Sequence, residues 1–64
     1  MMYMSKFFKT KDEAKAFQKE HGYGVMYSNE KGSRTKSSYR VEAAIHGLDE
    51  KQATEMPYVV AWNE

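Results

Sequence analysis

The chain has little aliphatic side chain to bury. Its 64 residues include one Leu, one Ile, four Val and three Phe, a fraction that indicates disorder when net charge is also high. The formal net charge is only +1, however, and five Tyr, five Met and one Trp offer further apolar surface. We therefore expect a folded domain whose core consists largely of aromatic and Met side chains.

The short length limits both the number of domains and the chemistry. We expect a single compact domain, residues 1–64, with a small core and a narrow margin of stability. There is no Cys, so neither a disulfide framework nor a thiolate metal site is available. No window approaches the length of a membrane-spanning helix, and no export signal is visible. These features predict a cytoplasmic domain without membrane contact.

The first half of the chain indicates a strand, a helix and a second strand. Aromatic and Met residues in the segment 2–9 predict the first strand. Thr10 and Glu13 have the spacing of a capping box, which predicts that a helix begins there and continues over residues 11–21. Tyr and Val then alternate with smaller residues over positions 23–28, which predicts the second strand.

The most regular alternation lies in residues 39–46. Its odd-numbered positions are apolar, namely Tyr39, Val41, Ala43 and Ile45, which is the period-two pattern of a strand with one buried face. A turn-forming segment, residues 29–37, separates this pattern from the preceding strand. We therefore expect residues 23–28 and 39–45 to pair as a β-hairpin with a long, basic tip.

Two further elements complete the pattern. Asp49 and Gln52 form a second capping box, and Pro57 ends the short helix that begins there. The segment 58–62 is rich in β-forming residues. The order βαββαβ favours an α+β fold, a small ferredoxin-like two-layer sandwich whose antiparallel sheet, in strand order 4-1-3-2, carries two short helices on one face. A meander with one packed helix is the alternative, because the second helix is so short.

Charge is unevenly distributed along the chain. Residues 1–40 hold nine Lys and Arg against four Asp and Glu, whereas residues 41–64 hold one against five. The stretch KGSRTKSSYR at the expected hairpin tip carries four cations and no acid: Lys31, Arg34, Lys36 and Arg40. A chain polarised in this way can contact a polyanion with its basic part, or a copy of itself with both parts.

The basic tip leads to the first functional hypothesis. Its cations and neighbouring hydroxyl groups suit contacts with phosphate, and a β-ribbon can enter a DNA groove. Tyr side chains flank the tip and are expected to stack on exposed bases. The domain is thus predicted to bind nucleic acid, DNA or RNA, through Lys31, Arg34, Lys36, Arg40, Tyr27 and Tyr39. The alternative is a solvated loop whose charges only prevent edge pairing.

The terminal strand leads to a second hypothesis. Trp62 lies on an expected edge strand, where it either closes the core or forms an apolar patch with Tyr58 and Val60. In the exposed arrangement, edge-to-edge pairing produces a homodimer or docks a larger protein partner. The domain is then a protein–protein interaction module with Tyr58, Val60 and Trp62 at its interface.

Metal binding and catalysis are not expected. His21 and His46 are the only His residues, and neither belongs to a spacing typical of a metal site. The Ser residues of the basic segment have no base close in sequence, and no two carboxylates are spaced for acid–base chemistry. We therefore expect no enzymatic activity, no catalytic residue and no cofactor.

Overall fold

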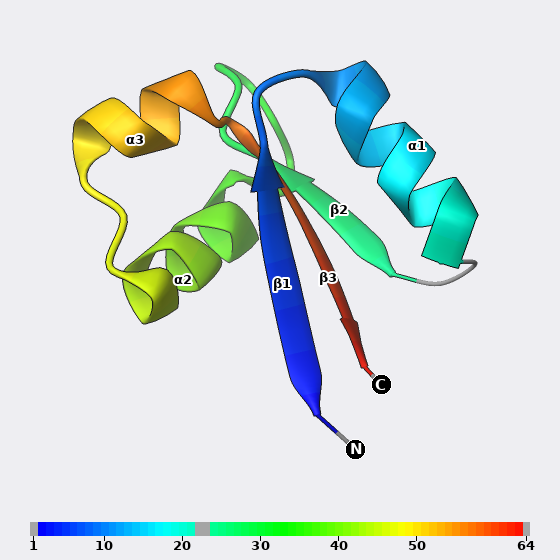
Figure 1. Cartoon of the computed structure of the whole chain (residues 1–64). Helices are drawn as coiled ribbons and strands as arrows, with labels where there is room; N and C mark the ends of the chain where they lie inside the picture. Colours follow the sequence, from blue (N-terminus) through cyan, green and yellow to red (C-terminus); the bar gives the residue numbers. More distant parts are fainter. Residues whose placement is uncertain (1, 22–23, 64) are drawn as a thin grey trace.

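The computed structural model describes residues 2–21 and 24–63, which form three strands and three helices (Figure 1). In chain order the elements are β1 (Tyr3–Phe8), α1 (Lys11–His21), β2 (Val25–Ser28), α2 (Lys36–His46), α3 (Glu50–Glu55) and β3 (Tyr58–Asn63). The sheet lies between two helical layers, with α1 on one face and with α2 and α3 on the other.

The last strand of the chain occupies the centre of the sheet. The strand order is β1-β3-β2, and β3 is antiparallel to both neighbours. Tyr58, for example, pairs with Phe8 on one side and with Ser28 on the other. The prediction that the terminal segment forms an edge strand is therefore wrong, because both of its edges are already hydrogen-bonded.

Burial on both faces explains why the sequence of β3 shows a continuous apolar run. Residues 58–61 are all buried. Val60 belongs to a core cluster with Phe8 on the α1 side, whereas Val59 belongs to a second cluster with Tyr39 on the α2 side. A strand covered on both faces has no solvent-facing positions for polar residues, so its sequence does not alternate.

The helix predicted after the first strand is confirmed with the same bounds. α1 runs from Lys11 to His21, and the hydroxyl of Thr10 accepts a hydrogen bond from the Glu13 amide at 3.2 Å, which is one half of the predicted capping box. Ala14 of this helix is fully buried in the α1-side core. The first two strands are also confirmed, although the expected start of the second, Tyr23, lies outside the described residues.

The largest difference from the sequence prediction lies in α2. Residues 39–45 are helical, so the predicted third strand is wrong, and its expected partner β2 pairs with β3 instead. The segment fits a helical period as well as a period of two, because Tyr39, Ala43 and His46 recur on one helical face. Gly47 then ends the helix at φ +70°, and its amide donates to the carbonyl groups of the last turn.

The helical period also changes which side chains are buried. An alternating strand would bury Val41 and Ile45 and expose Glu42. In α2, Glu42 is 4% exposed, whereas Val41 and Ile45 are 58% and 66% exposed. Tyr39 and Ala43 are buried beside Glu42 because the three residues follow an i, i+3, i+4 spacing on the side that faces the sheet.

The second predicted helix is confirmed as α3. The Gln52 amide donates to the Asp49 carboxylate at 2.8 Å, and the Asp49 amide donates to the Gln52 side chain at 3.1 Å. Leu48 and Ala53 pack against the α2-side core. Pro57 follows α3 and leads the chain into β3, because its ring cannot continue a helix.

The protein is thus a small α+β domain with a three-stranded antiparallel sheet. The ferredoxin-like sandwich is not confirmed, since the strand order is β1-β3-β2 and the segment 39–45 contributes no strand. The expectation that the helices share one face is wrong, because β3 is central and both of its faces need covering. Among the described residues, no helix combines the length and apolar character needed to cross a bilayer.

Candidate functional site

The predicted basic tip is the loop of residues 29–35 together with the first turns of α2. Hydroxyl groups hold this loop against the end of β2. The Ser28 amide donates to the Thr35 hydroxyl at 2.9 Å, and the Thr35 amide donates to the Ser33 hydroxyl at 3.2 Å. The Ser33 amide donates to the Glu30 carbonyl at 3.0 Å. The loop is therefore a hydrogen-bonded turn whose Ser33 and Thr35 hydroxyls are already engaged within the chain.

The four cations of this segment lie on the turn and on α2. Lys31 and Arg34 are exposed on the loop, Arg40 is exposed on α2, and Lys36 is half-buried in its first turn. None of the four forms a salt bridge with a carboxylate in the part of the chain that the structure describes. We call this set, Lys31, Arg34, Lys36 and Arg40, the basic surface.

The start of α2 adds to the positive potential of the basic surface. Its first turn contains no acidic residue. Thr35, at the N-cap, makes no side-chain capping bond, because its hydroxyl accepts from Ser28 instead. The amides at a helix start lack intrahelical partners, and the helix dipole favours negative charge there. The first turn of α2 is thus suited to an anion such as phosphate.

The two Tyr side chains expected to stack on bases contribute to the core. Tyr39 is 1% exposed, and its ring packs edge-on against Phe7 at a centroid distance of 5.6 Å. Its hydroxyl donates to the Met56 carbonyl at 2.7 Å, and burial raises the pKa of this hydroxyl above its ordinary value. Tyr27 is half-buried against the same cluster. The exposed position that stacking by Tyr39 requires is not found, and Tyr27 offers only part of its ring.

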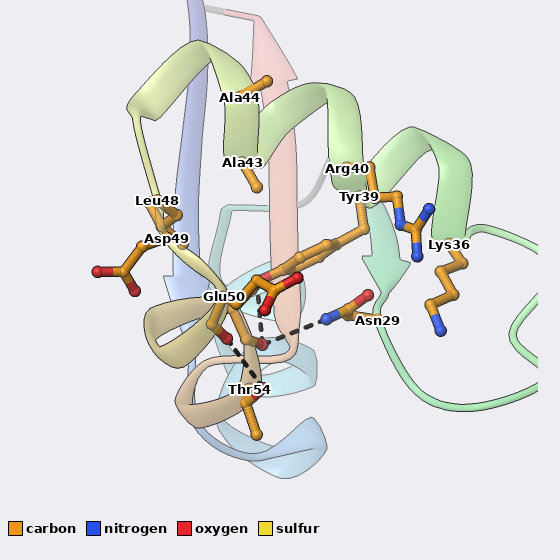
Figure 2. Close-up of a pocket in the computed structure, with 11 residues that line it drawn as sticks. Asn29, Lys36, Tyr39, Arg40, Ala43, Ala44, Leu48, Asp49, Glu50 and Thr54 are labelled. Carbon is orange, nitrogen blue, oxygen red and sulfur yellow. Dashed lines mark hydrogen bonds between the residues drawn. The ribbon is translucent and has the colours of Figure 1, made fainter.

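A groove of about 480 Å³ lies between α2 and α3 (Figure 2). Lys36 and Arg40 of the basic surface line it, together with Asp49 and Glu50 at the start of α3. In Figure 2, Lys36 lies toward one end of the groove and Asp49 toward the other. The groove is therefore polarised, with its positive end beside the basic loop and its negative end beyond the end of α2.

The second predicted interface, at β3, is not available as an edge. Tyr58 is 9% exposed and Val60 is fully buried. Trp62 is half-buried against α1, with its ring centroid 4.9 Å from that of Phe17. The edge position on which the predicted interface through Tyr58, Val60 and Trp62 depends is therefore wrong, because β3 is paired on both sides. Of the two arrangements left open for Trp62, the structure shows the one that closes the core.

A buried carboxylate, that of Glu42, was not predicted from the sequence. The Tyr3 hydroxyl of β1 donates to Oε2 of Glu42, whose Oε1 is buried without a hydrogen-bond partner. Although 54% of the Tyr3 side chain is exposed, its pKa is raised to about 12, first by burial and then by the bond to Glu42. The helical spacing of Glu42 with Tyr39 was the available signal, and the period-two interpretation concealed it.

A second missed contact joins β1 to the end of α2. The Ser5 hydroxyl and His46 Nε2 are in hydrogen-bond contact, and the His46 ring packs edge-on against Phe7 at a centroid distance of 5.5 Å. A hydroxyl beside an imidazole resembles the first part of a nucleophile–base pair, but such a pair also needs a group that orients the base. Within the described residues, His46 has no further hydrogen bond. We interpret the contact as structural.

His21 lies in the last turn of α1, where a cation complements the helix dipole. Its ring contacts Phe17 at a centroid distance of 4.1 Å and Trp62 at 5.6 Å, so the imidazole extends the aromatic cluster on that face. Residues 2–21 and 24–63 contain no group of three or more His, Cys, Asp or Glu that could hold a metal ion.

Comparison of the chain with protein-family models, with curated proteins and with solved structures gives no significant match. A function for the chain is therefore inferred from its own surface features. These are the basic surface, the polarised groove and the exposed face of α2.

Proposed function

We propose that the protein binds nucleic acid through the basic surface, Lys31, Arg34, Lys36 and Arg40. The observation that carries the proposal is the gathering of these four cations around one turn and one helix start, without a salt bridge among the described residues. A phosphate backbone is the common partner of such a cluster, because each contact releases counterions. The start of α2, which has no acidic residue in its first turn, strengthens the attraction.

The expected contact is with the sugar–phosphate backbone. Tyr39 is buried and Tyr27 is half-buried, so neither provides the exposed aromatic platform on which single-stranded bases stack. Asp49, toward the far end of the groove, and Glu50, over its middle, repel phosphate, so we expect the nucleic acid to approach from the loop side. Backbone contacts carry no direct sequence information, and binding should therefore be nearly independent of sequence.

A fluorescence-anisotropy titration with a labelled DNA duplex at several salt concentrations tests the proposal. Four phosphate contacts give a slope of log K against log salt concentration of roughly −3.6. The double substitution Arg34→Ala with Lys36→Ala should weaken binding equally for unrelated sequences, and should make the slope shallower by roughly two.

The matched control is the double substitution Lys15→Ala with Lys19→Ala. It removes the same charge from exposed positions on α1, which covers the opposite face of the sheet. We expect the control to retain wild-type affinity at moderate salt, because screening weakens distant charges. A wild-type chain that binds neither duplex nor single strands at low salt rules out the function. Equal losses in both double variants rule out the basic surface as its site.

A further inference from the structure

The outward face of α2 carries no charge. It consists of Ser37, Val41, Ala44 and Ile45, all of which are exposed, and Ala44 borders the groove beside Arg40. These residues follow an i, i+4, i+7, i+8 spacing and therefore form one stripe along the helix. We call them the uncharged stripe. The charged side chains of the same helix lie elsewhere, with Lys36 and Arg40 toward the groove and Glu42 buried.

This arrangement reverses the usual pattern of a surface helix, which buries its branched apolar residues and exposes its charges. Val41 and Ile45 remain in water, while the Glu42 carboxylate is buried with one oxygen unpaired. Desolvating such a group is unfavourable, and so is leaving apolar surface in water. Contacts among the described residues thus leave Val41 and Ile45 side by side in solvent, where a partner that covers them removes apolar surface from water.

We propose that the uncharged stripe binds the same stripe of a second copy of the chain, with the two α2 helices antiparallel. Charge complementarity argues for this partner. Lys36 and Arg40 lie in the first half of α2, whereas Asp49 and Glu50 follow its end, and Figure 2 shows Lys36 and Asp49 toward opposite ends of the groove. In an antiparallel pair, the basic start of each helix lies beside the acidic segment that follows the other.

Symmetry fixes the rest of the arrangement. A two-fold axis perpendicular to both helices relates the copies, so the groove side of one copy and that of the other lie on the same side of the interface. In the register that centres the two stripes on each other, Val41 of each copy contacts Ile45 of the other. A parallel pair would instead bring Lys36 beside Lys36 and Arg40 beside Arg40, which repel. Antiparallel helix dipoles favour the same choice.

The proposed contact is small. α2 has 11 residues and is about 16 Å long, so one helix pair buries less than the roughly 800 Å² per partner of a standard stable interface. Ser37 and Ala44 have small side chains, which allow the helix axes to approach closely. The dimer is therefore expected to be reversible and to form only at high protein concentration.

Sedimentation velocity from roughly 10 μM to 1 mM tests the proposal, since this range spans weak dissociation constants. The wild-type chain should change from monomer to dimer. Ile45→Asp should weaken the dimer by at least about tenfold, because it places a charge in the stripe. The matched control is Met2→Asp, at an equally exposed apolar side chain of 66% exposure outside α2, which should dimerise like the wild type. Circular dichroism verifies that each variant folds.

A charge reversal tests the orientation of the two helices. Lys36→Glu should weaken the dimer, and adding Glu50→Lys should restore it, because the pair is then reversed in both copies. Chemical shifts of the wild-type chain, measured over the same concentration range, give a test without any substitution. The shifts that change with concentration should belong to Val41, Ala44 and Ile45. A chain that stays monomeric, shifts that cluster along β1, or a dimer indifferent to Ile45→Asp overturns the proposal. If adding Glu50→Lys to Lys36→Glu does not restore the dimer, the antiparallel pairing is overturned.

Discussion

At the scale of single residues, polar contacts decide how α2 lies on the sheet. The Tyr39 hydroxyl donates to carbonyl groups at the end of α3 and beyond it, those of Ala53 at 3.3 Å and Met56 at 2.7 Å. Glu42 accepts from Tyr3, and His46 contacts Ser5, both of which belong to β1. These bonds fix the rotation of the helix about its axis, and this rotation leaves Val41 and Ile45 in solvent.

Tyr39→Phe removes one of these contacts. The Met56 carbonyl loses its side-chain donor, so we expect the free energy of unfolding to fall by about 1–2 kcal/mol in a urea titration. Tyr27→Phe is the control, since the Tyr27 hydroxyl makes no hydrogen bond among the described residues, and it should change stability by less than about 0.5 kcal/mol. Duplex affinity should be unchanged in Tyr39→Phe. A loss of affinity without a loss of stability would contradict the buried position of Tyr39.

At the scale of elements, local signals were sufficient for some segments and insufficient for others. The capping boxes at Thr10 and Asp49 fix helix starts from neighbouring residues, and both helices are confirmed. The segment 39–45 fits two periods, and the choice between them depends on the central position of β3. That position is set by pairing between residues far apart in the chain, which a local pattern cannot reveal.

The same limit applies to the candidate site. The exposure of Lys31, Arg34 and Arg40 follows from charge alone, because unpaired cations are rarely buried. Tyr3 and Glu42 are 39 residues apart in the sequence, and Ser5 and His46 are 41 apart, so neither contact has a local signature. The burial of Tyr39 likewise requires α3 to cover it.

Val41→Ala distinguishes a helix from a strand in this segment. Val41 is exposed on α2, so replacing a β-branched residue by Ala should stabilise the monomer by about 0.5 kcal/mol, measured at a concentration too low for association. The matched control is Val25→Ala in β2, where a side chain of similar exposure (53%) should show the opposite sign. A loss of stability in Val41→Ala would indicate that residues 39–45 are extended in solution.

At the scale of the whole molecule, β3 joins two separate cores. Val60 packs toward α1 and Val59 toward α2, so one strand carries the apolar contacts of both helical layers. Trp62 lies in the α1-side cluster. If β3 leaves the sheet, α1 and α2 both lose the strand against which they pack. We therefore expect the chain to unfold as one cooperative unit.

Substitution on either side of β3 should therefore affect the entire domain. Val59→Ala and Val60→Ala are each expected to lower the free energy of unfolding by about 2 kcal/mol, because both side chains are fully buried. Trp62 fluorescence and helical circular dichroism should follow coincident transitions in both variants. Separate transitions, with fluorescence lost before helicity in Val60→Ala, would show that the two layers unfold independently.

The antiparallel pairing of β1 with β3 has a practical consequence. Tyr3 pairs with Asn63 at one end of the sheet, whereas Ser28, which precedes the basic loop, pairs with Tyr58 at the other. A tag or tether joined before Tyr3 or after Asn63 thus leaves the sheet at the end remote from the basic loop. Immobilising the chain on a support through such a tether leaves the basic loop facing the surrounding solution.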